Sequence, residues 1–316
     1  MPGMADDTAI SELERQRRLL KALSRCRDAA SGGILDRLLQ RRRRRALLAR
    51  LDAEWRAGFV LHATGDLVFV PTPLDARGCH NLFHPPAAHA AALAVLAPGA
   101  VAIDIGASLG EWAVPLARAV GPSGRLFAFE PQPVAARALA QTFRINNLVQ
   151  AEAIEAAVSD RGGMQEMAIP EIASREVDSG RARIGIAGIG EAVSPVRSVT
   201  IDSFAGEAGL TRLDLVKIDV EGHERAVLAG ACNTLARFRP VIVMETGHES
   251  AADRAAIEAL LRGAGYALSG VLLDHGVVPA SWAAYAEAAA PCLPGEVHNL
   301  LLLPSTLAYR ESNGGR

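Results

Sequence analysis

From residue 99 onward, short apolar runs alternate with segments of mixed polar and apolar character. The apolar runs have the length of buried strands, and the segments between them show the spacing of amphipathic helices. Strands that alternate with helices indicate an α/β fold with a doubly wound, mostly parallel sheet. The strands that we expect lie at residues 101–105, 125–130, 151–158, 214–219, 240–245, 266–273 and 297–303.

The last two of these runs differ from the others, because no clear crossover helix joins them. We expect them to form the antiparallel edge of a seven-stranded sheet. Between residue 160 and the run at 198–202, glycines and alternating isoleucines indicate an inserted hairpin or lid. Helices are expected at residues 87–96, 133–145, 224–237 and 250–263.

The first 98 residues follow other patterns. Residues 11–30 and 34–57 have helical spacing and indicate a helical hairpin. The runs at 59–62 and 67–70 indicate a β-hairpin, and a loop rich in proline and histidine follows it. We therefore divide the chain into a helical arm (1–57), a β-hairpin with an approach loop (58–98), a main domain (99–305) and a tail (306–316).

Half of the residues are hydrophobic, yet no apolar run is long enough to span a membrane. The N-terminus lacks the basic start and apolar core of a signal peptide. The four cysteines are scattered without C-x-x-C spacing, which is typical of free thiols in a reducing compartment. We expect a cytoplasmic protein without a membrane partner.

The overall net charge of −2 conceals a basic N-terminal region on an acidic body. Residues 1–60 carry a net charge of +6, and the remainder carries −8. Arg41 to Arg45 could attract nucleic acid, but five successive arginines cover every face of a helix and no aromatic residues are interleaved for base stacking. We favour a solvated helix face or a homodimer arm through residues 1–57.

The turn after the first strand carries the strongest chemical signal. Asp104 ends the apolar run, and Gly106 and Gly110 open the next helix, for which Ser108 is the expected cap. Glycine lets a ligand lie against the main chain, and the helix N-terminus offers free N–H groups. Glu130 ends the second strand, about 20 residues past the turn, where a carboxylate can accept hydrogen bonds from both hydroxyls of a ribose. A nucleoside-containing cofactor is therefore implied.

The spacing of the turn separates two cofactor classes. A dinucleotide fingerprint has the form G-x-G-x-x-G, whereas this turn reads D-x-G-x-x-x-G. The latter resembles the first motif of Rossmann-like methyltransferases, in which the turn lies beside the amino acid part of S-adenosylmethionine. Ser159 and Asp160, at the end of the third strand, are placed where an adenine amino group could bind.

Several further motifs resemble the FkbM family of S-adenosylmethionine-dependent methyltransferases, over about residues 99–305. They are Phe129-Glu-Pro131, Ala157-Val-Ser-Asp160, Val199-Thr-Ile-Asp202, Asp214-Leu-Val-Lys-Ile-Asp-Val-Glu-Gly-His-Glu224, Val227-Leu-Ala-Gly-Ala231 and Glu245. The resemblance implies a class I methyltransferase fold and methyl transfer to a hydroxyl of a small molecule, often a sugar or a polyketide-type product. The cofactor-binding residues that follow are Asp104, Gly106, Ala107, Gly110, Glu130, Ser159, Asp160 and Asp219.

An alcohol is a poor nucleophile, so a base that removes its proton should accelerate methyl transfer by about 10²–10⁴-fold. His223 is the first candidate, because it lies at a helix start that disfavours the imidazolium form. His248, just beyond Glu245, is the rival, and either histidine could instead cap or pack. Lys217 shares a side of its strand with Asp219 and could pair with a carboxylate there.

A metal ion is a less favoured alternative to the histidine base. Asp219 or Glu221 could hold a divalent cation together with Glu245, and coordination would lower the pKa of the acceptor hydroxyl. A separate group near the N-terminal side of the main domain contains one cysteine and three histidines. Its spacing matches no known zinc pattern; the residues are Cys79, His80, His84 and His89.

Other functions remain open at this point. An N-methyltransferase or nucleic-acid methyltransferase would use the same fold, although the D-P-P-Y motif of base amino methylation is missing after the fourth strand. An NAD-dependent oxidoreductase is disfavoured by the turn spacing. A non-catalytic partner protein would bind the cofactor without turnover.

Overall fold

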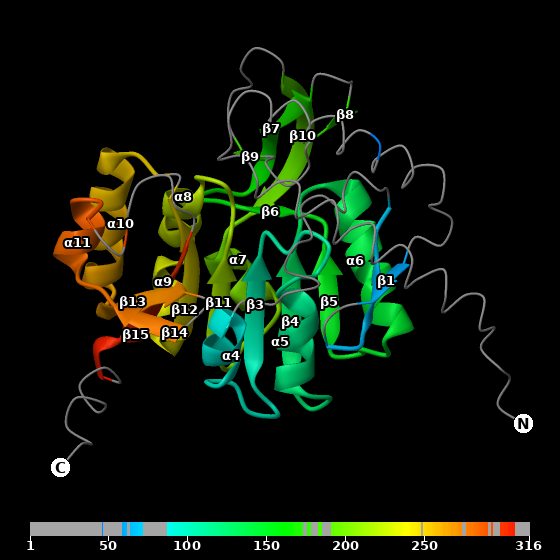
Figure 1. Ribbon diagram of the computed structural model, residues 1–316, viewed down its shortest axis with the longest axis horizontal. Coiled ribbons are helices and arrows are strands. Elements are labelled where there is room, and N and C mark those ends of the chain that lie inside the picture. Colours follow the sequence, from blue (N-terminus) through cyan, green and yellow to red (C-terminus); the bar gives the residue numbers. More distant parts are fainter. Residues whose placement is uncertain are drawn as a thin grey trace, which may run out of the picture.

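A computed structural model describes residues 46, 59–61, 64–71, 87–172, 176–177, 183–184, 191–247, 249–273, 276–289, 292 and 298–306 of the 316-residue chain. Within these residues, the centre of the fold is an eight-stranded sheet in the order β14-β13-β15-β12-β11-β3-β4-β5 (Figure 1). In that order the strands are Gly276–Pro279, Tyr266–Leu273, His298–Pro304, Val241–Thr246, Leu215–Ile218, Val101–Ile105, Arg125–Phe129 and Ala151–Ile154.

The strand directions confirm the predicted doubly wound, mostly parallel sheet. In this sheet, the successive neighbours β5, β4, β3, β11 and β12 are parallel. By contrast, β15 runs antiparallel to both β12 and β13. The segment after β13 contributes one strand that the sequence pattern did not indicate. This strand, β14, pairs antiparallel with β13 at the edge of the sheet. The sheet therefore has one strand more than predicted.

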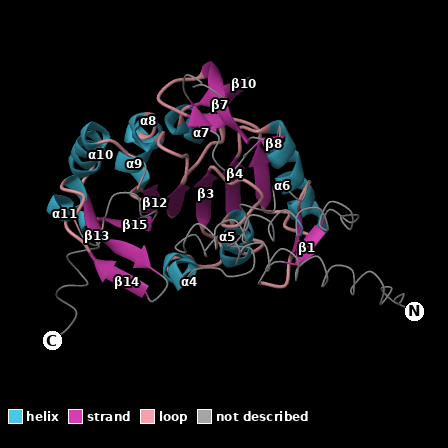
Figure 2. Ribbon diagram, turned by 45° about the horizontal axis from the view of Figure 1, so that its top comes forward, coloured by secondary structure: helices cyan, strands magenta, loops and turns pink. Residues whose placement is uncertain are grey.

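Helices cover both faces of this sheet (Figure 2). The residues of β3 show why, since Ala102 contributes to the core beneath α4 and α5, while Ile103 faces the core beneath α8 and α10. The helices are α4 (Ala87–Leu93), α5 (Ala113–Val120), α6 (Pro133–Ile145), α7 (Ile201–Glu207), α8 (Glu224–Ala229), α9 (Cys232–Phe238), α10 (Ala251–Gly263) and α11 (Trp282–Ala286). Among these described helices, none combines the length and apolar character needed to cross a bilayer.

The predicted third strand is divided between two sheets, which corrects the expected span of 151–158. Its first part is β5 in the main sheet, whereas β6 (Ala157–Val158) pairs in parallel with β10 (Glu191–Val199) of a second sheet. The second sheet also holds β7 (Gly163–Ile172), β8 (Glu176–Val177) and β9 (Arg183–Ile184). It is the predicted insertion, and it stands beyond the carboxyl ends of β3 and β4 (Figure 1).

The predicted β-hairpin is present as β1 (Phe59–Leu61) and β2 (Leu67–Phe69), and side chains of α6 and of its C-cap residue hold β2. Asn146 accepts from the Leu67 N–H at 3.0 Å and donates to the Leu67 carbonyl at 2.7 Å, and Thr142 accepts from the Phe69 N–H at 2.9 Å. The strand thereby satisfies main-chain groups that would otherwise lack partners. The helical arm except Ala46, the loop at 72–86 and the tail after residue 306 lie outside the described residues.

Candidate functional site

The turn between β3 and α5 is held in place by the neighbouring strands. The N–H groups of Gly106 and Ala107 both donate to the Phe129 carbonyl at 2.9 Å. Gly106 has a φ of 82°, and a Cβ atom at this position would lie 1.8 Å from the Asp219 carbonyl oxygen. Because only glycine tolerates that approach, the turn can close against the end of β11.

Ser108 does not have the capping role expected from the sequence. Helix α5 begins at Ala113, after Trp112, and receives no side-chain cap. Ser108 instead adopts a left-handed conformation, with φ 47°, and donates its N–H to Glu130 Oε2 at 2.9 Å. The additional residues of the turn displace the helix start, and the turn contacts the acid at the end of β4.

Glu130 is almost completely buried, with 4% of its surface exposed. Its Oε1 accepts from the Gln132 N–H at 2.9 Å, so both carboxyl oxygens are oriented by main-chain donors. Burial raises the pKa of Glu130 to about 7, and these hydrogen bonds oppose the rise. The structure places Glu130 beside the glycine turn, and its assignment to a ribose stays a prediction.

Lys217 is a fully buried ammonium at the centre of the site. Its Nζ donates to Asp219 Oδ2 at 3.0 Å and to the Ile218 carbonyl at 3.1 Å, and it lies 5.3 Å from the centre of the Trp112 ring. The predicted pairing of Lys217 with a strand-end carboxylate is therefore present. The Trp112 ring also packs against His89 at a centroid distance of 3.8 Å.

Asp104 occupies the matching position on β3, in register with Lys217. Its side chain is 1% exposed, and its Oδ2 has no hydrogen-bond partner. Burial raises the pKa of Asp104 to about 7, with Lys217 opposing the rise and Asp219 adding to it.

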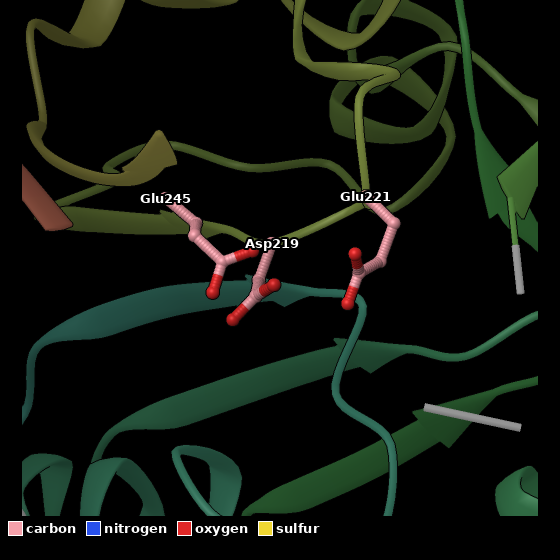
Figure 3. Close-up of side chains that lie close together, drawn as sticks. All are labelled: Asp219, Glu221 and Glu245. Atoms are coloured by element: carbon pink, nitrogen blue, oxygen red, sulfur yellow. The ribbon is translucent and has the colours of Figure 1, made fainter. Parts of the chain in front are cut away.

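Three carboxyl groups meet where β11 and β12 end (Figure 3). One ligand atom from each of Asp219, Glu221 and Glu245 lies within 4.8 Å of the others. Glu221 reaches this group from a left-handed turn, with φ 53° at Glu221 and 94° at Gly222. Burial, followed by the charge of Asp219, raises the pKa of Glu245 to about 10.

His223 occupies the cap position before α8, two residues after Glu221. Its Nε2 is 3.0 Å from Ser159 Oγ, and Ser159 Oγ donates to Asp160 Oδ1 at 3.1 Å. Burial lowers the pKa of His223, while the charge of Asp160 opposes this shift and that of Arg161 adds to it. The structure thus joins His223 to the predicted adenine-binding pair, and His248 lies outside the described residues.

The chain resembles known methyltransferases. Residues 104–268 match the family model described as "Methyltransferase FkbM domain". The chain is 30% identical over 199 residues to 31-O-demethyl-FK506 methyltransferase FkbM of Streptomyces tacrolimicus, an alignment that covers 54% of this chain and 74% of that protein. It is 31% identical over 152 residues to the 2-O-methyltransferase NoeI of Sinorhizobium fredii, covering 45% of this chain and 61% of the relative.

Among solved structures, the chain is similar to methyltransferase FkbM from Methylobacillus flagellatus KT. The sequences are 14% identical, the TM-score is 0.37, and the match covers 60% of this chain and 48% of that chain.

Proposed function

Because this chain belongs to the FkbM family of S-adenosylmethionine-dependent methyltransferases, we propose that it transfers the methyl group to a hydroxyl of a small-molecule acceptor. The choice of a hydroxyl acceptor rests on the names of two relatives. One is named for a 31-O-demethyl substrate, and the other is a 2-O-methyltransferase. Family membership excludes the oxidoreductase alternative and the non-catalytic alternative. N-methylation and nucleic-acid methylation remain as competing outcomes of the test below.

The geometry supports a specific position for the cofactor. In a doubly wound sheet, ligands bind beyond the carboxyl ends of the strands, where the turn at 104–110 and Glu130 lie together. We assign the amino acid part of S-adenosylmethionine to this turn and the ribose hydroxyls to Glu130. Ser159 and Asp160 then take the adenine end, and Asp219 lies on the side of the transferred methyl group.

The reaction is an in-line displacement. A lone pair of the acceptor oxygen forms the new O–CH₃ bond, the bond between the methyl carbon and sulfur breaks, and S-adenosylhomocysteine leaves with the sulfur lone pair. The hydroxyl proton passes to a base, for which His223 is our proposed group. Its buried position supports this role, because burial lowers the pKa of His223 and keeps the imidazole neutral near pH 7.

An acceptor screen tests the proposal. The full chain is incubated with S-adenosylmethionine and separate panels of sugars, polyketide-type alcohols, amines and RNA, and products are analysed by mass spectrometry and NMR. We expect a methyl ether from at least one hydroxyl acceptor and no methylated amine or RNA. Methylation confined to nitrogen or to RNA would contradict the proposed acceptor class.

A further inference from the structure

We propose that Asp219, Glu221 and Glu245 bind one divalent cation, and that this cation coordinates the acceptor hydroxyl beside the methyl group. The second part rests on the proposed function, because it requires a hydroxyl acceptor. The first part is independent of it. Nothing in the family match or in the names of the relatives refers to a metal.

The backbone brings the three carboxyl groups together from different elements. Asp219 follows β11, Glu245 is part of β12, and the two strands are parallel neighbours. Glu221 joins them because the chain turns back through two successive residues of positive φ, Glu221 and Gly222. One oxygen from each side chain lies within 4.8 Å of the other two, and Figure 3 shows the three side chains close together.

A buried carboxyl group on the neighbouring strand points to the same ligand. Asp104 lies in register with Lys217, so its side chain emerges on the face of the sheet that carries Lys217 and Asp219. Its Oδ2 is buried without a hydrogen-bond partner, a state that costs about 1–3 kcal/mol. A water molecule bound to a cation at Asp219 would donate to this oxygen, as the outer partners of metal sites commonly accept from inner ligands.

The charges of the site also favour a cation. Asp104, Asp219, Glu221 and Glu245 bring four carboxyl groups to the ends of three adjacent strands. Among the residues described there, Lys217 is the ammonium that faces them, and its Nζ is already bonded to Asp219 and to the Ile218 carbonyl. Without a further cation, protons must neutralise part of this group.

The donor atoms define the class of the metal. Three carboxylates are hard oxygen ligands, which suit Mg²⁺, Mn²⁺ or Ca²⁺ and not the thiolate-binding metals. All three side chains are half-buried. Mg²⁺ usually retains several exchangeable waters, and one of these positions can take the acceptor oxygen.

Coordination would make the hydroxyl more acidic without changing the displacement itself. The cation withdraws electron density from the hydroxyl oxygen and lowers its pKa. The proton leaves to the base, the oxygen lone pair attacks the methyl carbon, and the C–S bond electrons leave on S-adenosylhomocysteine. The metal keeps its oxidation state throughout.

The test measures metal binding separately from turnover. The full chain is treated with chelator, and Mn²⁺ is titrated by calorimetry and electron paramagnetic resonance, without S-adenosylmethionine. We expect one site per chain, and a loss of affinity of about tenfold or more in Glu221→Gln and in Glu245→Gln. The matched control is Glu152→Gln, an exposed acid on β5, which should bind Mn²⁺ as the wild type does.

Two further measurements separate the possible failures. Asp104→Asn should weaken Mn²⁺ binding less than Glu221→Gln does, because Asp104 acts through a bound water. Mn²⁺ binding that is absent, or equal in wild type and Glu221→Gln, overturns the metal site, provided that thermal unfolding shows both proteins folded. If Mn²⁺ binds as expected but no hydroxyl acceptor is methylated, the metal site stands and the proposed acceptor class fails.

Discussion

The imidazole of His223 and the hydroxyl of Ser159 lie 3.0 Å apart, and this contact joins α8 to the end of β6. Because Ser159 Oγ donates its proton to Asp160, it accepts from His223 when Nε2 carries the imidazole proton. Nδ1 is then the basic nitrogen. The contact therefore selects the tautomer in which the proposed base can act.

His223→Ala should lower kcat by about 10²-fold with little change in cofactor affinity, because a general base acts only in the transition state. The wild-type rate should fall as the pH decreases through the pKa of His223, which burial places below the ordinary value of 6.5. The variant should lose this acidic limb. Rates from pH 5 to 9 and cofactor titrations test both points; near-normal turnover with an unchanged profile would redirect attention to His248.

Glu130→Ala should weaken S-adenosylmethionine binding by about 2 kcal/mol, roughly 30-fold, the range for losing hydrogen bonds to a charged group. Glu152→Ala removes an exposed carboxylate of the adjacent strand and serves as the control. Calorimetric titration of both variants measures the difference. Equal affinities would remove the ribose assignment.

The stability of the ligand-free protein should depend on the ionisation of Glu130. Its pKa rises from 4.5 to about 7 on folding, so between these values the folded state binds more protons than the unfolded state. Stability due to this group must then fall as the pH rises from 4.5 to 7. Glu130→Gln should show a shallower fall in urea unfolding across this range. If the free energy of unfolding depends on pH in the same way in the variant and the wild type, burial does not raise the pKa of Glu130.

Gly106→Ala should destabilise the protein by about 2 kcal/mol or more and abolish cofactor binding. The added methyl group would collide with the Asp219 carbonyl, and φ at this position is 82°. Gly206→Ala is the matched control, because this glycine lies within α7 and has no atoms within 4 Å of the added carbon. Denaturant unfolding should show Gly206→Ala to be neutral or stabilising. Similar losses in both variants would contradict the steric explanation.

The sequence pattern predicted best the elements whose own apolar residues determine which face is buried. The strand at 101–105 and the helix at 133–145 have the observed bounds, since apolar periodicity records which face is buried. The division of the third strand was not predictable in this way. Residues 151–154 and 157–158 are extended in either arrangement, and their separation depends on β10, which lies far along the chain.

Prediction of the candidate site from the sequence has the same limit, because contacts between distant residues are not visible in the pattern. The sequence could place Glu130, Asp219 and Glu245 at one edge of the sheet, because parallel strands end there, but their roles stay predictions. Trp112, which contacts Lys217 and His89, was missed, since a single tryptophan before a helix has the pattern of a core residue. The sequence grouped His89 with Cys79 and His80, but neighbours along the chain do not reveal that its ring packs on Trp112.

The second sheet both leaves and rejoins the main domain through one pair of strands, β6 and β10. Val158 and Val199 are paired in that ladder, and the Ser159 N–H donates to the Val199 carbonyl at 3.0 Å. The two junctions of the insertion are thus adjacent and fixed to each other. An intervening segment from another family member can be grafted between them without changing the distance that the graft must span. Chimeras exchanged at residues 160 and 198 would therefore test whether the insertion contributes to the choice of acceptor.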